Sequence, residues 1–519
     1  MVDETDIESA GSARAVDVFG EESQPSYYQE RLWFLTRLHP RLTAFNAVCA
    51  VRYHKPIEVD RLRAACTVLM GRHSVLRTRY PERMGSCAVA ECVHCAPVEA
   101  VYDSGDLASV EEARIAHLLE AAIWSPFDYE EGPLFRIVTL PLGETDACVA
   151  AVVHRLVGNE SSVHALLLEL LTEYGAIIRG DSPRTVSIPP QFAEFSVRQR
   201  AEYPQGSPTE LPAPWRRALE QGPALLALPT DFPRPAVKTY AGGSVTFELP
   251  DLFPELLTLK SAGAAEDLSS KLLGAFFVLL SRYTRQDDFM VGARTQFVPS
   301  PFSGGPLGPG DNYVPICGVL HDDPTWSELC ARVRAQWSEA VKVPAFPFER
   351  VIAEAHPGRE TSHSPLFQAE FSYEELPWPS GPARDLISTI ELGTSICPVD
   401  IGLHCRKTGF SLHCRLDYSA DLFHESTVQR MARHFTALLR DGFAHPNRTL
   451  SALHLMDDVE LRLVTEEFNR TQVVYPRDKR LHDLLDAQSA TTPERPAVQF
   501  EEVSLTYRQF TELANRLAH

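Results

Sequence analysis

The chain has 519 residues, of which 44% are hydrophobic and 23% are charged, as in folded globular proteins. At about 150 residues per domain, this length predicts roughly three to four domain-sized units and excludes a fibrous or disordered chain. There are 49 basic and 69 acidic residues, and the resulting net charge of −20 disfavours nucleic acid as a main partner.

The location in the cell follows from what the sequence lacks. No segment reaches the roughly 18 consecutive apolar residues of a membrane span, and the acidic start is unlike a secretory signal. Eleven cysteines, an odd number scattered along the chain, do not form a disulfide framework. We therefore expect a cytoplasmic protein with reduced thiols and no membrane partner.

Polar segments mark the predicted domain boundaries. Residues 1–22 are acidic and are expected to form a flexible leader. A Pro- and Gly-rich stretch at 299–311 predicts a flexible loop near a domain interface. A charged stretch over 457–480 predicts an interdomain linker, after which a new pattern begins at Leu481.

Between these marks, strand-like and helix-like patterns alternate. The run ACVAAVV at 147–153 predicts a strand that is covered on both faces. Apolar residues then recur at helical spacing from Val163 to Tyr174, with Asn159, Ser161 and Ser162 as alternative N-caps. Residues 154–160 are therefore predicted to form a strand-to-helix loop. With a buried helix over 271–283 followed by a strand, the alternation predicts α/β layers.

Several longer segments point to one family. They are SYYQERLWFL at 26–35, RHSVLRTRY at 72–80, TRQDDFMVG at 284–292, SPLFQ at 364–368 and LDYSADLF at 416–423. Together they resemble the condensation domain of nonribosomal peptide synthetases. Residues 191–203, Trp215 and LPTD at 228–231 resemble the crossing between the two halves of that domain.

The resemblance implies a fold and a reaction. The fold is α/β, with two lobes like chloramphenicol acetyltransferase that form a V around a central tunnel. We assign the N-lobe to 23–205 and the C-lobe to 206–456. In this family, two carrier proteins insert phosphopantetheine arms into the tunnel. The amine of a carrier-bound aminoacyl group attacks a carrier-bound acyl or peptidyl thioester and forms an amide, and the chain itself binds no cofactor.

The tail carries a second resemblance. Residues 481–519, which include LTYRQF at 505–510, are similar to the first segment of an adenylation domain. The adjoining adenylation domain is therefore an expected partner. About forty residues are too few for an adenylation core, so this chain is not expected to activate amino acids.

The central motif of the family, His-His-x-x-x-Asp-Gly, is altered here. The chain reads HRLVGNESS at 154–162, which places His154 on the first histidine and Arg155 on the second, catalytic one. Asn159 takes the position of the aspartate and Glu160 that of the glycine. Arginine has only donors and stays protonated, so it cannot act as a base, although its donors can steady an oxyanion. We expect ordinary base-assisted condensation to be lost.

Each motif residue also has a structural interpretation. His154 is expected to be a buried, hydrogen-bonded histidine, as the first histidine of the family is. Arg155 either points into the tunnel or pairs with Glu160 or another carboxylate, and the sequence favours neither. Ser161 and Ser162 are expected to cap the helix and not to act as nucleophiles.

A second departure lies in the other lobe. Aligning VGARTQFV at 291–298 with the family's IGTPxAGR places Val298 where an arginine normally pairs with the motif aspartate. Both charged partners are then replaced together, by Asn159 and Val298. Arg294 lies nearby and is the candidate substitute. The resemblance makes Ser162, Arg294 and Val298 the candidate substrate-binding residues.

The altered motif is also similar to His-Arg-x-x-x-Asp-Asp of the X domains of glycopeptide synthetases, which recruit oxygenases to a carrier-bound peptide. Three functions therefore compete: an enzyme that forms an amide or a variant acyl-transfer product, an inactive platform, and a docking surface for a tailoring enzyme.

No metal site is expected. Cys87, Cys92, His94 and Cys95 supply only one ligand pair, whereas a structural zinc site needs two. HC at 404–405 and HC at 413–414 are expected to lie in strands.

Overall fold

A computed structural model describes residues 24–38, 45–83, 86–87, 89–91, 98–100, 112–181, 188–205, 210–221, 225–249, 264–342, 346–355, 362–377, 385–390, 392–394, 396–408 and 411–519. The chain divides into two compact units, 1–455 and 456–519. The predicted leader over 1–22 lies outside the described residues.

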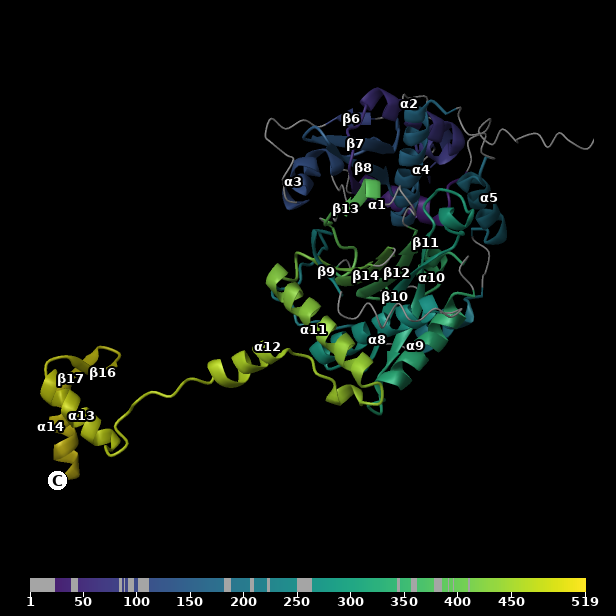
Figure 1. The fold of residues 1–519 in the computed structure, drawn as a ribbon. Coiled ribbons are helices and arrows are strands. Elements are labelled where there is room, and N and C mark those ends of the chain that lie inside the picture. Colours follow the sequence, from purple (N-terminus) through teal and green to yellow (C-terminus); the bar gives the residue numbers. More distant parts are fainter. Residues whose placement is uncertain are drawn as a thin grey trace, which may run out of the picture. The chain divides into compact units, whose positions relative to one another are not determined.

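The first sheet of the larger unit has five strands in the order β13-β1-β8-β7-β6 (Figure 1). Their bounds are Ile387–Ile390 (β13), Asn46–Tyr53 (β1), Asp146–His154 (β8), Phe135–Leu142 (β7) and Val98–Ala100 (β6). The helices of this region are α1 (Tyr27–Leu38), α2 (Val59–Arg72), α3 (Glu112–Ile123), α4 (Glu160–Arg179) and α5 (Phe192–Glu202). A 3₁₀ turn, Ser74–Arg77, and four two-residue strands complete it: β2 (Thr78–Arg79), β3 (Glu82–Arg83), β4 (Ser86–Cys87) and β5 (Ala90–Glu91).

Strand β8 confirms the prediction for 147–153. Val149, Ala151 and Val153 pack in one core with α2 and α4, whereas Ala150 and Val152 pack in a second core with α3. Successive side chains of a strand point to opposite faces. A strand covered by helices on both sides therefore needs the continuous apolar run that the sequence shows.

The second sheet has six strands in the order β11-β10-β12-β14-β15-β9 (Figure 1). Their bounds are Asp311–Val319 (β11), Asp288–Gln296 (β10), Ala369–Leu376 (β12), Ile401–Thr408 (β14), Ser411–Ser419 (β15) and Gly242–Glu248 (β9). The helices here are α6 (Ala213–Glu220), α8 (Ala264–Thr284), α9 (Trp326–Ala340), α10 (Phe348–Ala355) and α11 (Glu425–Ala444), with 3₁₀ turns at Pro301–Ser303 and Leu450–Ala452. The helix predicted over 271–283 and the two HC strands are confirmed.

The two faces of this second sheet differ in polarity. Phe371, Leu403 and Leu416 pack in a core with α8, α9 and α11. The neighbouring positions on the same strands carry charge, such as Glu370 and Arg415, and point away from that core. The sheet thus presents a polar face, and the candidate site is built there. Two open sheets with covering helices confirm the predicted α/β class.

One strand from the second half of the chain joins the first sheet. Strand β13 follows β12 in the chain, yet it pairs antiparallel with β1 of the first sheet, with Ala50 opposite Ile390. Chain order alone assigns this segment to the second lobe, so the lobes are not two consecutive halves of the sequence.

The loop over 299–311 differs from the expected flexible loop. Residues 305–310 are buried. A Cβ added to Gly308 would lie 2.2 Å from the ring of Phe192, and the Gly308 carbonyl accepts a 2.7 Å hydrogen bond from Ser162. The glycines and prolines here allow the backbone to pack closely against the first lobe.

Helix α4 is long and apolar enough to cross a membrane by composition, but 56% of its apolar window is buried. Because α4 packs against β1 and β8 in the first core, its apolar character is that of a core helix.

The smaller unit contains α12 (Asp458–Arg462), a π-helical turn (Leu463–Glu467), α13 (Leu481–Thr491), β16 (Pro496–Phe500), β17 (Val503–Thr506) and α14 (Tyr507–Ala518). Strands β16 and β17 form an antiparallel pair.

Candidate functional site

The altered motif forms the turn between β8 and α4. The strand ends at His154, and the helix begins at Glu160. Asn159 is the N-cap, because its side-chain oxygen accepts a 2.9 Å hydrogen bond from the Ser162 backbone N–H. The predicted loop over 154–160 is confirmed, and Asn159 is the cap among the three alternatives.

His154 is a buried, neutral side chain. It is 5% exposed, and its Nδ1 accepts a 3.2 Å hydrogen bond from the Leu156 backbone N–H. The rings of Phe45 and Phe127 pack edge-on against it, each with a centroid distance of 6.2 Å. Burial, helped by the charge of Arg155, lowers the pKa of His154 to about 3. The structural interpretation of this histidine is supported.

We predict that His154 does not titrate between pH 5.5 and 8 and carries its proton on Nε2, because Nδ1 is the acceptor. Long-range ¹H–¹⁵N correlation spectra check both statements. A ring nitrogen shift that moves with pH, and disappears in His154→Gln, would contradict this assignment.

Arg155 is held by carboxylates. Its guanidinium forms two hydrogen bonds with Glu160, one of 3.2 Å from Nη1 to Oε2 and a shorter one from Nη2 to Oε1. A second carboxylate, Asp311 of β11, lies 3.5 Å from Nη1. Burial acts against the charged form, but Glu160, Tyr28 and Asp311 together outweigh it and the pKa of Arg155 is raised. Of the two alternatives left open by the sequence, the structure shows the ion pair.

Asn159 has an unexpected partner in the second lobe. Its Nδ2 donates a 2.8 Å hydrogen bond to Oδ1 of Asp311. Val298 is buried close by: a Cβ added to Gly310 would lie 2.7 Å from Cγ2 of Val298 and 3.9 Å from Nδ2 of Asn159. The Asn159 amide and the apolar Val298 side chain thus lie close together beside Asp311.

Arg294 contacts the motif through Glu160 and not through Asn159. It pairs with Glu160 at 3.3 Å and with Glu370 of β12 at 3.1 Å, and Asn159 is bonded to Asp311 instead. The candidate substitute Arg294 thus joins the second lobe to the motif by an ion pair with Glu160. Burial alone would raise the pKa of Glu160, but the charges of Arg155 and Arg294 hold this pKa well below its usual value.

These pairs continue across the polar face of the second sheet. Glu370 accepts a 2.9 Å hydrogen bond from the Tyr313 hydroxyl and lies 3.3 Å from Nε2 of His404. The same nitrogen lies 3.2 Å from Asp417, which pairs with Arg415 at 2.7 Å. Burial acts to lower the pKa of His404, but Asp417 and Glu370 together raise it above its usual value. We call this series, from Arg155 through Glu160, Arg294, Glu370, His404 and Asp417 to Arg415, the charge network.

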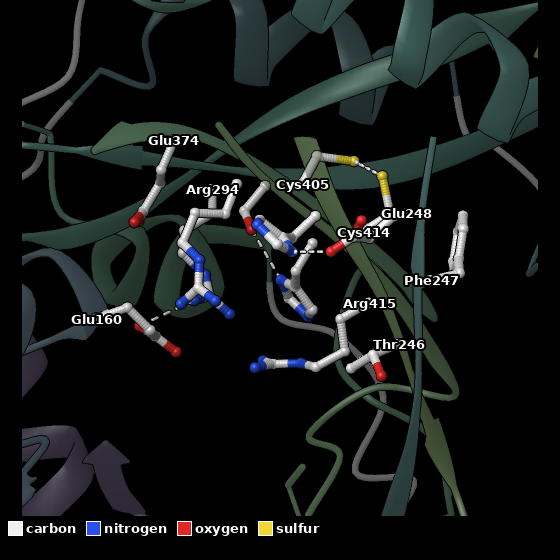
Figure 2. Close-up of a pocket in the computed structure, with 13 residues that line it drawn as sticks. Glu160, Thr246, Phe247, Glu248, Arg294, Glu374, Cys405, Cys414 and Arg415 are labelled. Atoms are coloured by element: carbon white, nitrogen blue, oxygen red, sulfur yellow. Dashed lines mark hydrogen bonds and ion pairs between the residues drawn. The ribbon is translucent and has the colours of Figure 1, made fainter. Parts of the chain in front are cut away.

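Two cavities meet at the charge network. The motif cavity, of ≈ 310 Å³, is lined by Arg155 and by residues of α1, β11, α10 and the SPLFQ segment. The sheet cavity, of ≈ 270 Å³, is lined by residues of β9, β12, β14 and β15. Both are lined by Glu160, Arg294 and Arg415. Figure 2 shows Glu160 beside Arg294 in the sheet cavity, with Arg415 approaching from its own strand. The ion pairs of Glu160, Arg294 and Arg415 therefore lie where the motif cavity and the sheet cavity adjoin.

Of the six candidate residues, only Arg155 and Arg294 line a cavity. His154, Asn159 and Val298 are buried beside the turn, and the Ser162 hydroxyl is bonded to the Gly308 carbonyl. Sequence reasoning did not single out Asp311, Glu370, Asp417 or Arg415 as site residues. The available signal was the alternation of charged and apolar residues along β12 and β15, which marks a strand with one polar face.

No group of three or more His, Cys, Asp or Glu side chains that could hold a metal ion occurs within the described ranges. Cys92, His94 and Cys95 lie outside them. The buried cysteines of the described ranges, such as Cys405 and Cys414, are free thiols.

The chain was compared with known proteins. Residues 22–465 match the model of the condensation domain family. A linear gramicidin synthase protein of Brevibacillus parabrevis is 32% identical over 508 residues, which is 95% of this chain and 10% of that protein. A second protein of the same synthase is 33% identical over 509 residues, or 95% of this chain and 6% of that protein. The chain therefore spans a tenth or less of the length of these relatives.

Solved structures agree in fold. A holo four-domain nonribosomal peptide synthetase bound to AMP and glycine gives a TM-score of 0.74 at 21% identity, covering 96% of this chain and 39% of that one. The X-domain from teicoplanin biosynthesis gives 0.67 at 22% identity, covering 86% of this chain and 99% of that one.

The matched open-sheet fold and the family model over most of the chain define the class. The chain belongs to the condensation domain family of nonribosomal peptide synthetases.

Proposed function

We propose that this condensation-type domain has lost amide formation through its motif, and that the altered motif residues now join the two lobes by ion pairs and hydrogen bonds. The observation that supports the proposal is the pairing of Arg155, at the catalytic histidine position, with Glu160. An arginine does not accept a proton, and the charge of this one is already engaged by Glu160 and Asp311.

The other altered motif residues also contact the second lobe. Glu160 pairs with Arg294, Asn159 bonds to Asp311, and both partners come from strands of the second sheet. A glycine at position 160 would leave the space beside Arg155 open, whereas Glu160 places a charged side chain where the motif cavity and the sheet cavity adjoin. The substitutions are mutually consistent, because each new charge has a partner.

The partners follow from the family. We propose that acyl or peptidyl and aminoacyl carrier proteins present phosphopantetheine-bound groups to this domain in the cytoplasm. Residues 481–519 are proposed to begin an adjoining adenylation domain, and the exposed apolar side chains of α13 and α14, including Leu481 and Leu517, are consistent with a further part of that domain packing there.

The test is a gain of function. Arg155→His/Glu160→Gly restores His-His-x-x-x-Asn-Gly, and Arg294 keeps Glu370 as its partner. The assay supplies a donor thioester on its carrier and a loaded acceptor carrier in a single turnover. We expect the parent to form amide no faster than the two carriers do without the domain, and the double variant to form it at least about 100-fold faster than that background, the usual contribution of a positioned acid or base. Intact-protein mass spectrometry measures the product.

Matched variants make this test decisive. Arg155→Met/Glu160→Gln removes the charges without supplying a base and is expected to stay inactive. His363, which also lines the motif cavity, is the other imidazole to examine. If the parent forms amide, and His363→Ala abolishes it while Arg155→Met does not, the proposed loss of activity is wrong.

A second candidate function is recruitment of a tailoring enzyme. It is favoured by the His-Arg-x-x-x-Asn-Glu motif and by the fold shared with an X-domain, which has been solved in complex with OxyB. Binding of an oxygenase to this domain, measured by calorimetry with carriers absent, would support it.

A further inference from the structure

Lys238, which precedes β9, is a buried cation in the wall of the motif cavity. It is 7% exposed. Its ammonium donates hydrogen bonds of 2.9 Å to the Pro398 carbonyl and 3.1 Å to the Ser364 hydroxyl. Both acceptors are uncharged, so the positive charge of Lys238 is solvated but not neutralised by these contacts.

The other cations that line this cavity are neutralised. Each arginine pairs with a carboxylate: Arg31 with Glu349 at 3.0 Å, Arg155 with Glu160, Arg294 with Glu370 at 3.1 Å, and Arg415 with Asp417 at 2.7 Å. Within the described part of the chain, Lys238 has no carboxylate in contact. A buried charge is destabilising unless it is paired. Lys238 thus lacks a counter-ion of the kind that each neighbouring arginine has.

The ionisable groups around Lys238 do not replace that anion. Asp400 is engaged in two hydrogen bonds with Arg234, of 3.0 and 2.5 Å, and Glu370 is engaged with Arg294. Burial is the main cause that lowers the pKa of Lys238, and it outweighs the weaker attraction of Cys397, Asp400 and Glu370.

The rest of the cavity suits a short carbon chain. The apolar side chains that line the same cavity include Phe348, Phe367, Ile396 and Val399. A volume of ≈ 310 Å³ is at the lower end of small-molecule sites, and such sites combine apolar walls with a few placed polar groups. A carboxylate on a short chain matches this combination of an apolar lining and one uncompensated ammonium.

We propose that the motif cavity binds an acyl or aminoacyl group that bears a free carboxylate, with Lys238 as its counter-ion. The inference rests on the proposed presentation of carrier-bound groups to this cavity, but not on the loss of amide formation. The bound carboxylate accepts charge-assisted hydrogen bonds from Nζ, which are stronger than bonds between neutral groups.

The experiment compares two pantetheine thioesters that differ only in charge, the succinyl thioester and its carboxamide analogue, by isothermal titration calorimetry. We expect the parent domain to bind the succinyl thioester about 10- to 100-fold more tightly, as for a hydrogen bond to a charged group. Lys238→Met, which keeps the length of the side chain, is expected to abolish this preference, and Lys238→Arg is expected to keep it.

The outcomes separate the two proposals, because binding is measured and not amide formation. Equal affinity of the parent for both thioesters, no binding of the succinyl thioester, or a preference that survives in Lys238→Met would each overturn the inference. The first two need no variant, so they hold even if Lys238→Met does not fold. Tighter binding of the succinyl thioester would support the role of Lys238 whether or not the parent domain forms amide.

Discussion

Replacing Arg155 by methionine is expected to lower the free energy of unfolding by about 3–5 kcal/mol, as when one partner of a buried ion pair is removed. Methionine keeps much of the apolar stem but leaves Glu160 and Asp311 without this cation. Glu160 then keeps its ion pair with Arg294, and Asp311 keeps the hydrogen bond from the Asn159 amide. Urea unfolding followed by circular dichroism measures the change.

Two controls define what this loss means. Arg155→Met/Glu160→Gln removes both charges and is expected to recover most of the stability, because no carboxylate at 160 is then stranded. Arg216→Met removes an exposed cation, 45% exposed and paired with Glu210, and is expected to cost less than about 1 kcal/mol. If Arg155→Met costs no more than Arg216→Met, the motif does not join the lobes.

Changing Asn159 to aspartate is expected to destabilise the domain by about 3 kcal/mol at pH 7. The new carboxylate would face Asp311 at the 2.8 Å contact now made by the amide. Burial already raises the pKa of Asp311, and a second carboxylate beside it would raise the pKa of the pair further. One of the two groups must then keep its proton, or both remain charged in contact.

The pH dependence of this variant has a defined sign. The folded variant binds an extra proton that the unfolded chain releases above about pH 4, so its stability relative to the parent falls as pH rises. We expect the deficit to be smaller at pH 5.5 than at pH 8 in urea titrations. Asn159→Asp/Val298→Arg supplies the arginine that this family places there and is expected to reduce the deficit. A deficit that does not vary with pH would show that charge is not its cause.

Local pattern predicted the elements that carry the motif. The run at 147–153 identified β8, and apolar residues at helical spacing identified α4 with Asn159 among its caps. These predictions succeed because strand alternation, helix period and N-capping are set by residues within a few positions of one another. The same reasoning identified Arg155 and Glu160 as possible partners, since they flank one short turn.

The charge network depended on distant residues. Asp311 lies 152 positions from Asn159, and Arg294 lies 134 positions from Glu160. The sequence pointed to Arg294 as a substitute for the arginine missing at position 298, and strand β10 places it against Glu160 and Glu370. A family alignment identifies which residues have changed, but it does not show which of them meet after the change.

The sequence by itself determined the family, the α/β class and the loss of an imidazole at position 155, because these follow from residue identity, local period and motif order. Only the tertiary structure decided that Arg155 is neutralised, that the loop at 305–310 is buried and that Lys238 contacts no carboxylate among the described residues. Those properties are differences in burial and in the distance between charges, and they arise only when the strands of the two sheets bring separate parts of the chain together.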